Sequence, residues 1–296
     1  MPTQQRHPGG GQGRPVPSPG RQRPDRKRLC RAALVSLLWT ALACSRSETT
    51  PRLQWHLLAQ GFEYARANRA VQADEPAITV HWLRLDPSKV TLEVVQAPTD
   101  LAKPLGDAVA FRRKVGGLAA INGGYFDPQW RPLGLLVSQG KELSKLRKVD
   151  HGVFALAGNR ASVQHAKAWQ PPEGLEFAVE CGPRLLVDGL PLTFRPGLAR
   201  RVALGIDKEG RVVIGVTEGV LTLKAWAELL EMSADHGGPA LLQALTLAGG
   251  SSTMLDVVAG GLTASVRSAV QVPVGIAVVA RTAIAPIAAA PTPSQN

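Results

Sequence analysis

A glycine pair that interrupts an apolar run constrains this chain more than any other feature of its sequence. The apolar run at 244–248 ends at Gly249 and Gly250, and Ser251, Ser252 and Thr253 follow before the chain returns to apolar residues. This pattern predicts a buried strand, a tight turn and a second short strand. Glycine allows positive φ and the close approach of another group. The hydroxyl groups are therefore expected to face whatever fills that space, with a purely structural hairpin as the alternative.

A second stretch of the chain has the same arrangement. Residues 118–121 are apolar, and the polar turn that follows them contains Asn122, Gly123, Gly124, Tyr125, Phe126 and Asp127. Two strands that each end in a Gly-Gly turn are expected to form two walls of one cleft. Asn122 can bind sugar hydroxyl groups because an amide both donates and accepts hydrogen bonds. An asparagine before two glycines is also a common turn former, so both roles stay open.

The segment between these two stretches completes an ordered set of motifs. Arg201 opens an apolar strand, a turn at 207–210 leads to a second strand, and Glu218 with Gly219 precedes a helical pattern. The set resembles the phosphodiester glycosidase family, whose pattern runs Asn-Gly-Gly-Phe-Phe, Arg-Thr-Ala-Ile-Gly, Asp-Gly before a helix, and Asn-Leu-Asp-Gly-Gly-Gly-Ser. That family includes an enzyme that removes N-acetylglucosamine from phosphodiester-capped mannose. The resemblance covers residues 80–279 and implies the family's fold and the hydrolysis of a sugar 1-phosphodiester.

The chain departs from the family pattern at two positions. Val202 stands where the family has threonine, and Ala248 stands where the family has aspartate. Glycoside hydrolysis normally uses two carboxyl groups, and alanine supplies none. Two hypotheses follow. The protein is either an exported hydrolase of this family or a carbohydrate- and phosphate-binding envelope protein that keeps the fold without turnover.

Two carboxylates are the leading candidates for chemistry. Glu218 matches the family's Asp-Gly position and is the first candidate acid or base, whereas a solvent-facing carboxylate at a strand end is the alternative. Asp127 is the second candidate, and its alternative role is to cap its own turn. Glu180 and Asp256 are weaker candidates, the latter because strand alternation puts its side chain on a different face from Leu255.

Substrate binding is expected from the residues around the two glycine turns. Arg201 matches the family arginine and can hold a phosphate through paired charge-assisted hydrogen bonds. The predicted substrate-binding set is Asn122, Gly123, Gly124, Arg201, Gly249, Gly250, Ser251 and Ser252. The six histidines are scattered and no Cys/His cluster has zinc spacing, so we predict no metal and no cofactor.

The net charge of +11 suggests nucleic-acid binding at first sight, but it is unevenly distributed. Residues 1–45 hold eight basic residues and one acidic residue, which leaves 26 basic and 22 acidic residues, or +4, for the rest. A body with interspersed charges of both signs has no electrostatic footprint for DNA. We therefore expect a carbohydrate or glycosyl-phosphate ligand and no nucleic acid.

The beginning of the chain has the pattern of an export signal. Residues 1–28 are basic and poor in apolar residues, which predicts disorder. An apolar stretch follows over 29–43 and ends in small residues, as in a secretory signal peptide. Cys44 comes next and resembles the lipidated cysteine of a bacterial lipobox. The protein is thus expected to be exported, either as a soluble periplasmic form or as a lipoprotein anchored to the cell-envelope membrane.

The remaining pattern predicts one folded domain. We expect a linker at 45–60, the domain at 61–282 and a loose Pro/Ala-rich tail at 283–296. Residues 77–85 and 90–95 are expected to pair as a hairpin, residues 104–114 to form a short helix, and Thr222 to cap a helix that His236 and Gly237 end. Short strands dominate the rest, so the predicted class is α+β with a many-stranded, mostly antiparallel sheet and a few packed helices.

Overall fold

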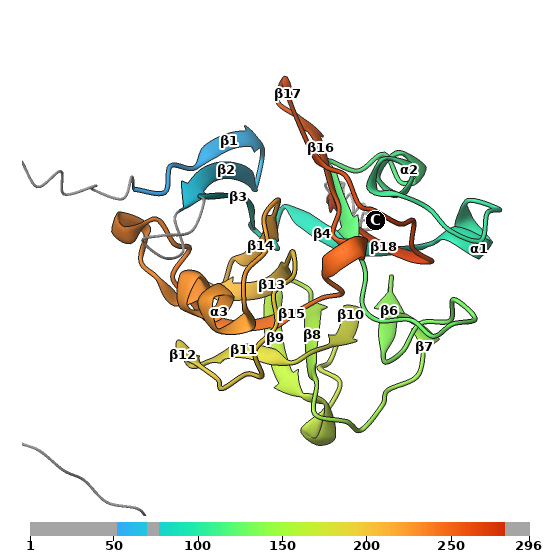
Figure 1. The fold of residues 1–296 in the computed structure, drawn as a ribbon. Coiled ribbons are helices and arrows are strands. Elements are labelled where there is room, and N and C mark those ends of the chain that lie inside the picture. Colours follow the sequence, from blue (N-terminus) through green and yellow to red (C-terminus); the bar gives the residue numbers. More distant parts are fainter. Residues whose placement is uncertain (1–51, 70–76, 282–296) are drawn as a thin grey trace, which may run out of the picture. The chain divides into compact units, whose positions relative to one another are not determined.

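The computed structural model describes residues 52–69 and 77–281. The predicted basic leader, the signal peptide with Cys44 and the predicted tail lie outside the described residues. Within these, eighteen strands form three sheets with antiparallel pairing throughout (Figure 1). The α+β class with mostly antiparallel strands is confirmed, and the strands divide among three sheets instead of forming one.

The first sheet has eight strands. Its strands, in spatial order, are β1 (His56–Ala59), β2 (Phe62–Arg69), β3 (Ile78–Leu85), β14 (Val212–Thr217), β13 (Val202–Asp207), β15 (Leu241–Thr246), β11 (Arg184–Val187) and β12 (Leu190–Pro191). The predicted hairpin across residues 207–210 is confirmed as the β13–β14 pair. Because Leu53 is already buried and β1 begins at His56, the folded region starts earlier than Gly61, and the predicted linker at 45–60 is too long at its end.

Two further sheets have five strands each. One contains β7 (Lys141–Ser144), β6 (Leu136–Ser138), β10 (Leu175–Cys181), β8 (Gly152–Ala157) and β9 (Arg160–His165). The other contains β17 (Leu262–Val266), β16 (Leu255–Ala259), β5 (Ala119–Asn122), β18 (Val274–Ala280) and β4 (Val90–Gln96). The second of these sheets matters for the site, because β5 and β16 flank the two Gly-Gly loops and pair with each other.

One predicted pairing is wrong. The strands β3 and β4 follow each other across a short turn, yet they belong to different sheets. Both edges of β3 are occupied, by β2 and by β14, and β4 pairs with β18 instead. Alternation of apolar residues determines which face of a strand is buried but does not select its partner.

The main hydrophobic core contains residues from all three sheets. It includes Leu83 and Ile214 of the eight-stranded sheet, Phe154 of the second sheet, and Ile121 and Ile276 of the third. Each of these side chains is at most 1% exposed. Burial of large apolar side chains is the main force that stabilises such a fold. The core therefore fixes the strand ends from which the loops of the candidate site extend.

The helices are short. They are α1 (Ala97–Asp100), α2 (Ala108–Lys114) and α3 (Leu223–Glu231), with 3₁₀ turns η1 (Ala166–Ala168), η2 (Ala234–His236) and η3 (Gly250–Ser252). The predicted helix at 104–114 begins only at Ala108, because the Asp107 carboxylate caps it by accepting from the Ala110 N–H at 2.9 Å. No helix in the described part of the chain is long and apolar enough to cross a membrane.

The helix α3 begins as predicted. The Thr222 hydroxyl accepts from the Ala225 N–H at 3.1 Å. Trp226 is buried and stacks on Trp82 of β3 with ring centroids 5.4 Å apart, which attaches the helix to the eight-stranded sheet. The helix ends at Glu231, earlier than predicted, and the separate turn η2 leads to Gly237, whose positive φ ends that turn.

Candidate functional site

The two Gly-Gly loops lie next to each other, as the sequence predicted. The buried Asn122 side chain donates from Nδ2 to the Ala248 carbonyl oxygen at 2.7 Å and accepts at Oδ1 from the Met254 N–H at 3.2 Å. Gly123 is buried as well, and Gly124 lies against Cys181. Asn122 is fully buried, and its side chain bonds to backbone groups on both sides of the second loop. It therefore joins the two loops.

The second Gly-Gly loop is not a hairpin turn, so that alternative is wrong. The strand β15 before it and the strand β16 after it belong to different sheets, and the loop carries the chain from one to the other. A Cβ at Gly249 would lie 2.6 Å from the Arg200 carbonyl oxygen, which only glycine permits. Gly250 has φ of 63° and its N–H donates to the same oxygen at 2.8 Å. The glycines thus hold the loop against Arg200.

An open cavity of about 610 Å³ lies beside this loop. Its lining brings together Glu218, Gly250 and Ser251 of the predicted site with two further arginines, Arg200 and Arg267. We call this space the Glu218 cavity. Arg200 donates to the carbonyl oxygens of Gly250 and Arg267, at 3.3 and 2.8 Å. Neither arginine forms an ion pair within the described ranges, so both cations remain available to an anion.

The Glu218 carboxylate is held by a chain of polar side chains. Its Oε1 lies 2.8 Å from His81 Nε2, and His81 Nδ1 lies 2.8 Å from the Tyr64 hydroxyl. Arg66 is 3.8 Å from the same carboxylate oxygen. A neutral imidazole protonated on Nε2 satisfies both contacts, since Nε2–H donates to Glu218 and Nδ1 accepts from Tyr64. The side chain of Glu218 stays 44% exposed, whereas His81 is buried.

Burial controls the protonation of this chain. It lowers the pKa of His81, and the hydrogen bond to Glu218 only partly opposes this effect. Burial also raises the pKa of the Tyr64 hydroxyl. Both groups are therefore neutral near pH 7, which agrees with the tautomer that donates to Glu218.

Arg201, the predicted phosphate ligand, has a different position. Its guanidinium donates to the carbonyl oxygens of Leu221 and Gly197, at 3.0 and 2.5 Å, and its backbone N–H donates to the Thr217 hydroxyl. Partial burial lowers the pKa of Arg201. These bonds tie the loop before β13 to the segment after β14. In this structure Arg200, not Arg201, lines the Glu218 cavity.

Residue 248, where the family has aspartate, is almost inaccessible to solvent. Ala248 is 6% exposed, and its N–H lies 3.4 Å from the Gly123 carbonyl oxygen. The Thr246 hydroxyl lies 3.0 Å from the Val202 carbonyl oxygen, and Ser252 is 7% exposed. Of the predicted serines, only Ser251 lines the Glu218 cavity.

Asp127 serves its own turn. One carboxylate oxygen accepts from the backbone N–H groups of Gln129 and Arg131, each at 2.9 Å, and the other pairs with the Arg131 side chain at 2.7 Å. These bonds, the backbone N–H of Arg131 first, lower the pKa of the carboxyl group. Asp127 does not line the Glu218 cavity, so the structure does not bring the two predicted carboxylates together there.

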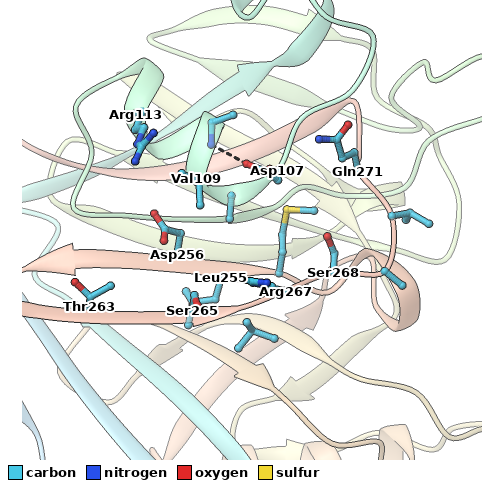
Figure 2. Close-up of a pocket in the computed structure, with 16 residues that line it drawn as sticks. Asp107, Val109, Arg113, Leu255, Asp256, Thr263, Ser265, Arg267, Ser268 and Gln271 are labelled. Carbon is cyan, nitrogen blue, oxygen red and sulfur yellow. Dashed lines mark hydrogen bonds between the residues drawn. The ribbon is translucent and has the colours of Figure 1, made fainter.

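Asp256 lines a different cavity, of about 670 Å³, between α2 and β17 (Figure 2). Figure 2 shows Asp256 and Arg113 among the side chains that line this cavity. The Asp256 carboxylate is buried and lies 2.5 Å from Arg112 Nε. It is therefore committed to an ion pair beneath α2 and cannot stand in for a carboxylate at position 248.

Sequence reasoning missed His81, Tyr64, Arg200 and Arg267. The first two lie on neighbouring strands, β3 and β2, and their contact depends on a pairing that no local pattern indicates. A usable signal was present, because His81 stands between the apolar residues Val80 and Trp82. Arg267 comes from the segment after β17 and meets Arg200 across 67 positions of sequence.

The described residues contain no group of three or more His, Cys, Asp or Glu side chains arranged to hold a metal ion. Cys181 is buried, and burial raises the pKa of its thiol to about 12. A thiol in such a setting is unreactive as a nucleophile.

Two comparisons with solved structures show the same fold. The chain matches the catalytic domain of the zebrafish N-acetylglucosamine-1-phosphodiester alpha-N-acetylglucosaminidase, auto-inhibited by its pro-peptide, with a TM-score of 0.61 and 19% identity over 78% of this chain and 87% of that one. It also matches a hypothetical protein from Synechocystis, with a TM-score of 0.57 and 16% identity over 78% of this chain and 64% of that one.

Sequence comparison gives the family. The uncharacterized protein YigE of Escherichia coli is 30% identical over 107 residues, which cover 32% of this chain and 42% of that protein. The match thus spans less than half the length of this relative. The family model for phosphodiester glycosidase matches residues 116–279, more than half of the chain, and includes both Gly-Gly loops, Arg200 and Glu218. The chain belongs to the phosphodiester glycosidase family.

Proposed function

We propose that this protein is an exported hydrolase that cleaves the glycosidic bond of a sugar 1-phosphodiester. The observation that carries the proposal is the Glu218 cavity, which combines one exposed carboxylate with two arginines that form no ion pair among the residues the structure describes. Family membership supports the same reaction class. The binding partner is accordingly a glycosyl phosphate, and no cofactor enters the proposal.

Each group in the cavity has a role that fits the reaction. Arg200 and Arg267 would hold the phosphodiester by charge-assisted hydrogen bonds, which are the strongest bonds a guanidinium forms. Glu218 would accept a proton from the water that attacks the anomeric carbon. The His81 N–H and the Arg66 cation both complement a carboxylate, which suits Glu218 as the base rather than the acid.

Export rests on the sequence alone. The basic start, the apolar stretch at 29–43 and Cys44 have the order of a bacterial export signal. We propose that the protein works in the cell envelope, as a periplasmic protein or tethered through lipidated Cys44.

Ala248 favours a second candidate function. A carbohydrate- or phosphate-binding protein with the same fold would keep the cations of the cavity and lose the chemistry. The almost closed position of Ala248 and its lack of a carboxyl group support this alternative. It predicts that the protein binds a sugar 1-phosphodiester without turnover and that Ala248→Asp creates activity.

The test is turnover of a chromogenic sugar 1-phosphodiester by the exported chain and by Glu218→Gln. We expect the wild type to turn over and Glu218→Gln to lose roughly 10²- to 10⁴-fold in kcat, the usual contribution of a general base. Glu209→Gln is the matched control, because Glu209 is 47% exposed, close to the 44% of Glu218, and lies in a turn away from the cavity. Wild-type binding without turnover would instead establish the binding protein.

A further inference from the structure

A second cavity adjoins the Glu218 cavity. It is the space of about 670 Å³ that Asp256 lines, and we call it the α2 cavity. Three consecutive residues after β17, namely Arg267, Ser268 and Ala269, line both cavities. We call these three residues the dividing segment, because they form part of the wall of each space.

The dividing segment is fixed to the second Gly-Gly loop. The Ser251 carbonyl oxygen accepts from the N–H groups of Ala269 and Val270, at 2.9 and 3.3 Å. The Arg267 carbonyl oxygen accepts from Arg200 at 2.8 Å. The backbone of the segment is therefore held in place. The guanidinium of Arg267 forms no hydrogen bond or ion pair among the described residues, so it is available to a phosphate where the two cavities adjoin.

The α2 cavity is large enough for a sugar-sized group. Its volume falls within the roughly 300–1,000 Å³ that is usual for small-molecule sites. Figure 2 shows side chains with guanidinium, hydroxyl and amide groups along it, among them Arg113, Thr263, Ser265 and Gln271. These four side chains make no hydrogen bond to other residues in the described part of the chain. Their donors and acceptors are therefore free to bind a ligand that carries hydroxyl groups.

The charge left unpaired in the α2 cavity is positive. The Asp256 carboxylate pairs with Arg112, and the Asp107 carboxylate caps α2. Arg113 and Arg267 also line the cavity, and neither forms an ion pair within residues 52–69 and 77–281. The cavity thus offers two guanidinium groups to an anion, of which only that of Arg267 is shared with the Glu218 cavity.

The rotation of α2 explains why Arg113 lines this space. Val109 and Arg113 are four positions apart, so they share one face of the helix, and both line the cavity. Phe111 lies on another face and is fully buried in the core. Packing of Phe111 fixes the helix, and the fixed helix carries Arg113 on the side of the cavity.

We propose that the α2 cavity binds the alcohol half of the sugar 1-phosphodiester and that Arg113 recognises a second phosphate on that half. The inference rests on the proposed function, in which Arg200 and Arg267 hold the scissile phosphodiester and Glu218 faces the anomeric carbon. A phosphodiester has two ester oxygens. One of them leads to the sugar beside Glu218, and the other leads past Arg267 into the adjoining cavity.

This placement names a substrate class. The alcohol half carries hydroxyl groups, which bind the free side chains of the α2 cavity, and a phosphate, which binds Arg113 through charge-assisted hydrogen bonds. A chain of phosphate-linked sugar or polyol units has both features. The protein would then release a terminal sugar from such a chain.

The apolar side chains of the α2 cavity do not favour an alkyl alcohol instead. Val109 and Val270 are 37% and 44% exposed there. Single exposed valines are ordinary on a protein surface. An alkyl chain in this cavity would displace water from two guanidinium groups without giving them a partner, a cost that an anion avoids.

The experiment compares three diesters of one sugar 1-phosphate, with methanol, glycerol 3-phosphate or octanol as the alcohol. Release of free sugar gives kcat/KM for each. We expect the glycerol 3-phosphate diester to exceed the methyl diester by about 10-fold, mainly through a lower KM. Arg113→Gln should bring this ratio below about 3. Added salt should also reduce the wild-type ratio, because Arg113 is exposed and its interaction with a phosphate is screened.

The matched control is Lys114→Gln. Lys114 is exposed like Arg113 and is the next residue of α2, but it lines another cavity. Its replacement removes the same charge, so Lys114→Gln should keep the wild-type ratio between the two diesters. Equal loss in both variants would mean that only the overall charge of α2 acts, and this would overturn the role of Arg113.

The outcomes separate this inference from the proposed function. A wild type that cleaves the methyl and glycerol 3-phosphate diesters equally well overturns the subsite and leaves the proposed function intact. A preference for the octanol diester overturns the second phosphate and assigns the cavity to an apolar alcohol. A wild type that cleaves none of the three overturns the proposed function and the subsite with it.

Discussion

Two carboxylate–imidazole pairs of this protein are built in opposite ways. In the first, His81 is buried and Glu218 is exposed, 2.8 Å apart. In the second, Glu180 is buried and His151 reaches the surface, 3.4 Å apart. The exposed partner is the one that can meet a ligand, and the buried partner orients it. The burial of each member, more than the presence of a pair, therefore decides which residue is accessible to a ligand.

The largest expected effect is on stability, because the two carboxylates should contribute very differently to the free energy of unfolding. Glu180→Ala removes a buried charge and leaves the backbone N–H groups of Leu135 and Arg147 without their acceptor. We expect a loss of about 3–5 kcal/mol in the free energy of unfolding. Glu218→Ala should cost less, about 1–3 kcal/mol, because its carboxylate is 44% exposed but its loss leaves the buried His81 N–H without an acceptor. Urea denaturation of both variants checks this, and equal losses would remove the distinction between the pairs.

A smaller expected effect is the pH dependence of stability that His81 causes. Burial lowers the pKa of His81 in the folded protein below its ordinary value of 6.5, so as the pH falls the unfolded chain binds a proton before the folded chain does. The free energy of unfolding should therefore decrease as the pH drops below about 6.5, by less than about 1.4 kcal/mol per pH unit, the limit for one proton. His81→Gln should lose this dependence.

The check is the free energy of unfolding measured by urea denaturation between pH 5.5 and 7.5. His165→Gln is the control variant, because its ring faces Asp150 and its replacement leaves the His81–Glu218 pair intact. A wild-type slope that persists in His81→Gln would contradict the assignment of this effect to His81.

Local patterns predicted much of this fold. The strand β13, the turn at 207–210 and the cap at Thr222 follow from residue types over a few positions, and all three are confirmed. The pairing of β4 with β18 was beyond reach, because these strands lie far apart in the chain and nothing local selects the partner. The same limit explains the wrong hairpin between β3 and β4.

The candidate site was predictable to a lesser degree. The adjacency of the two Gly-Gly loops followed from their shared pattern, and Glu218, Gly250 and Ser251 do line one cavity. Which of the neighbours Arg200 and Arg201 faces that cavity depends on the backbone direction at the start of β13, which composition does not give. His151 and Glu180 meet only because β8 pairs with β10.

The most direct test of the proposed site is a crystal structure of Glu218→Gln with an uncleaved sugar 1-phosphodiester. We expect the phosphate between Arg200 and Arg267, with the anomeric carbon facing residue 218. A ligand bound only in the cavity beside Arg113 and Asp256, or a phosphate that contacts neither Arg200 nor Arg267, would contradict the proposed site.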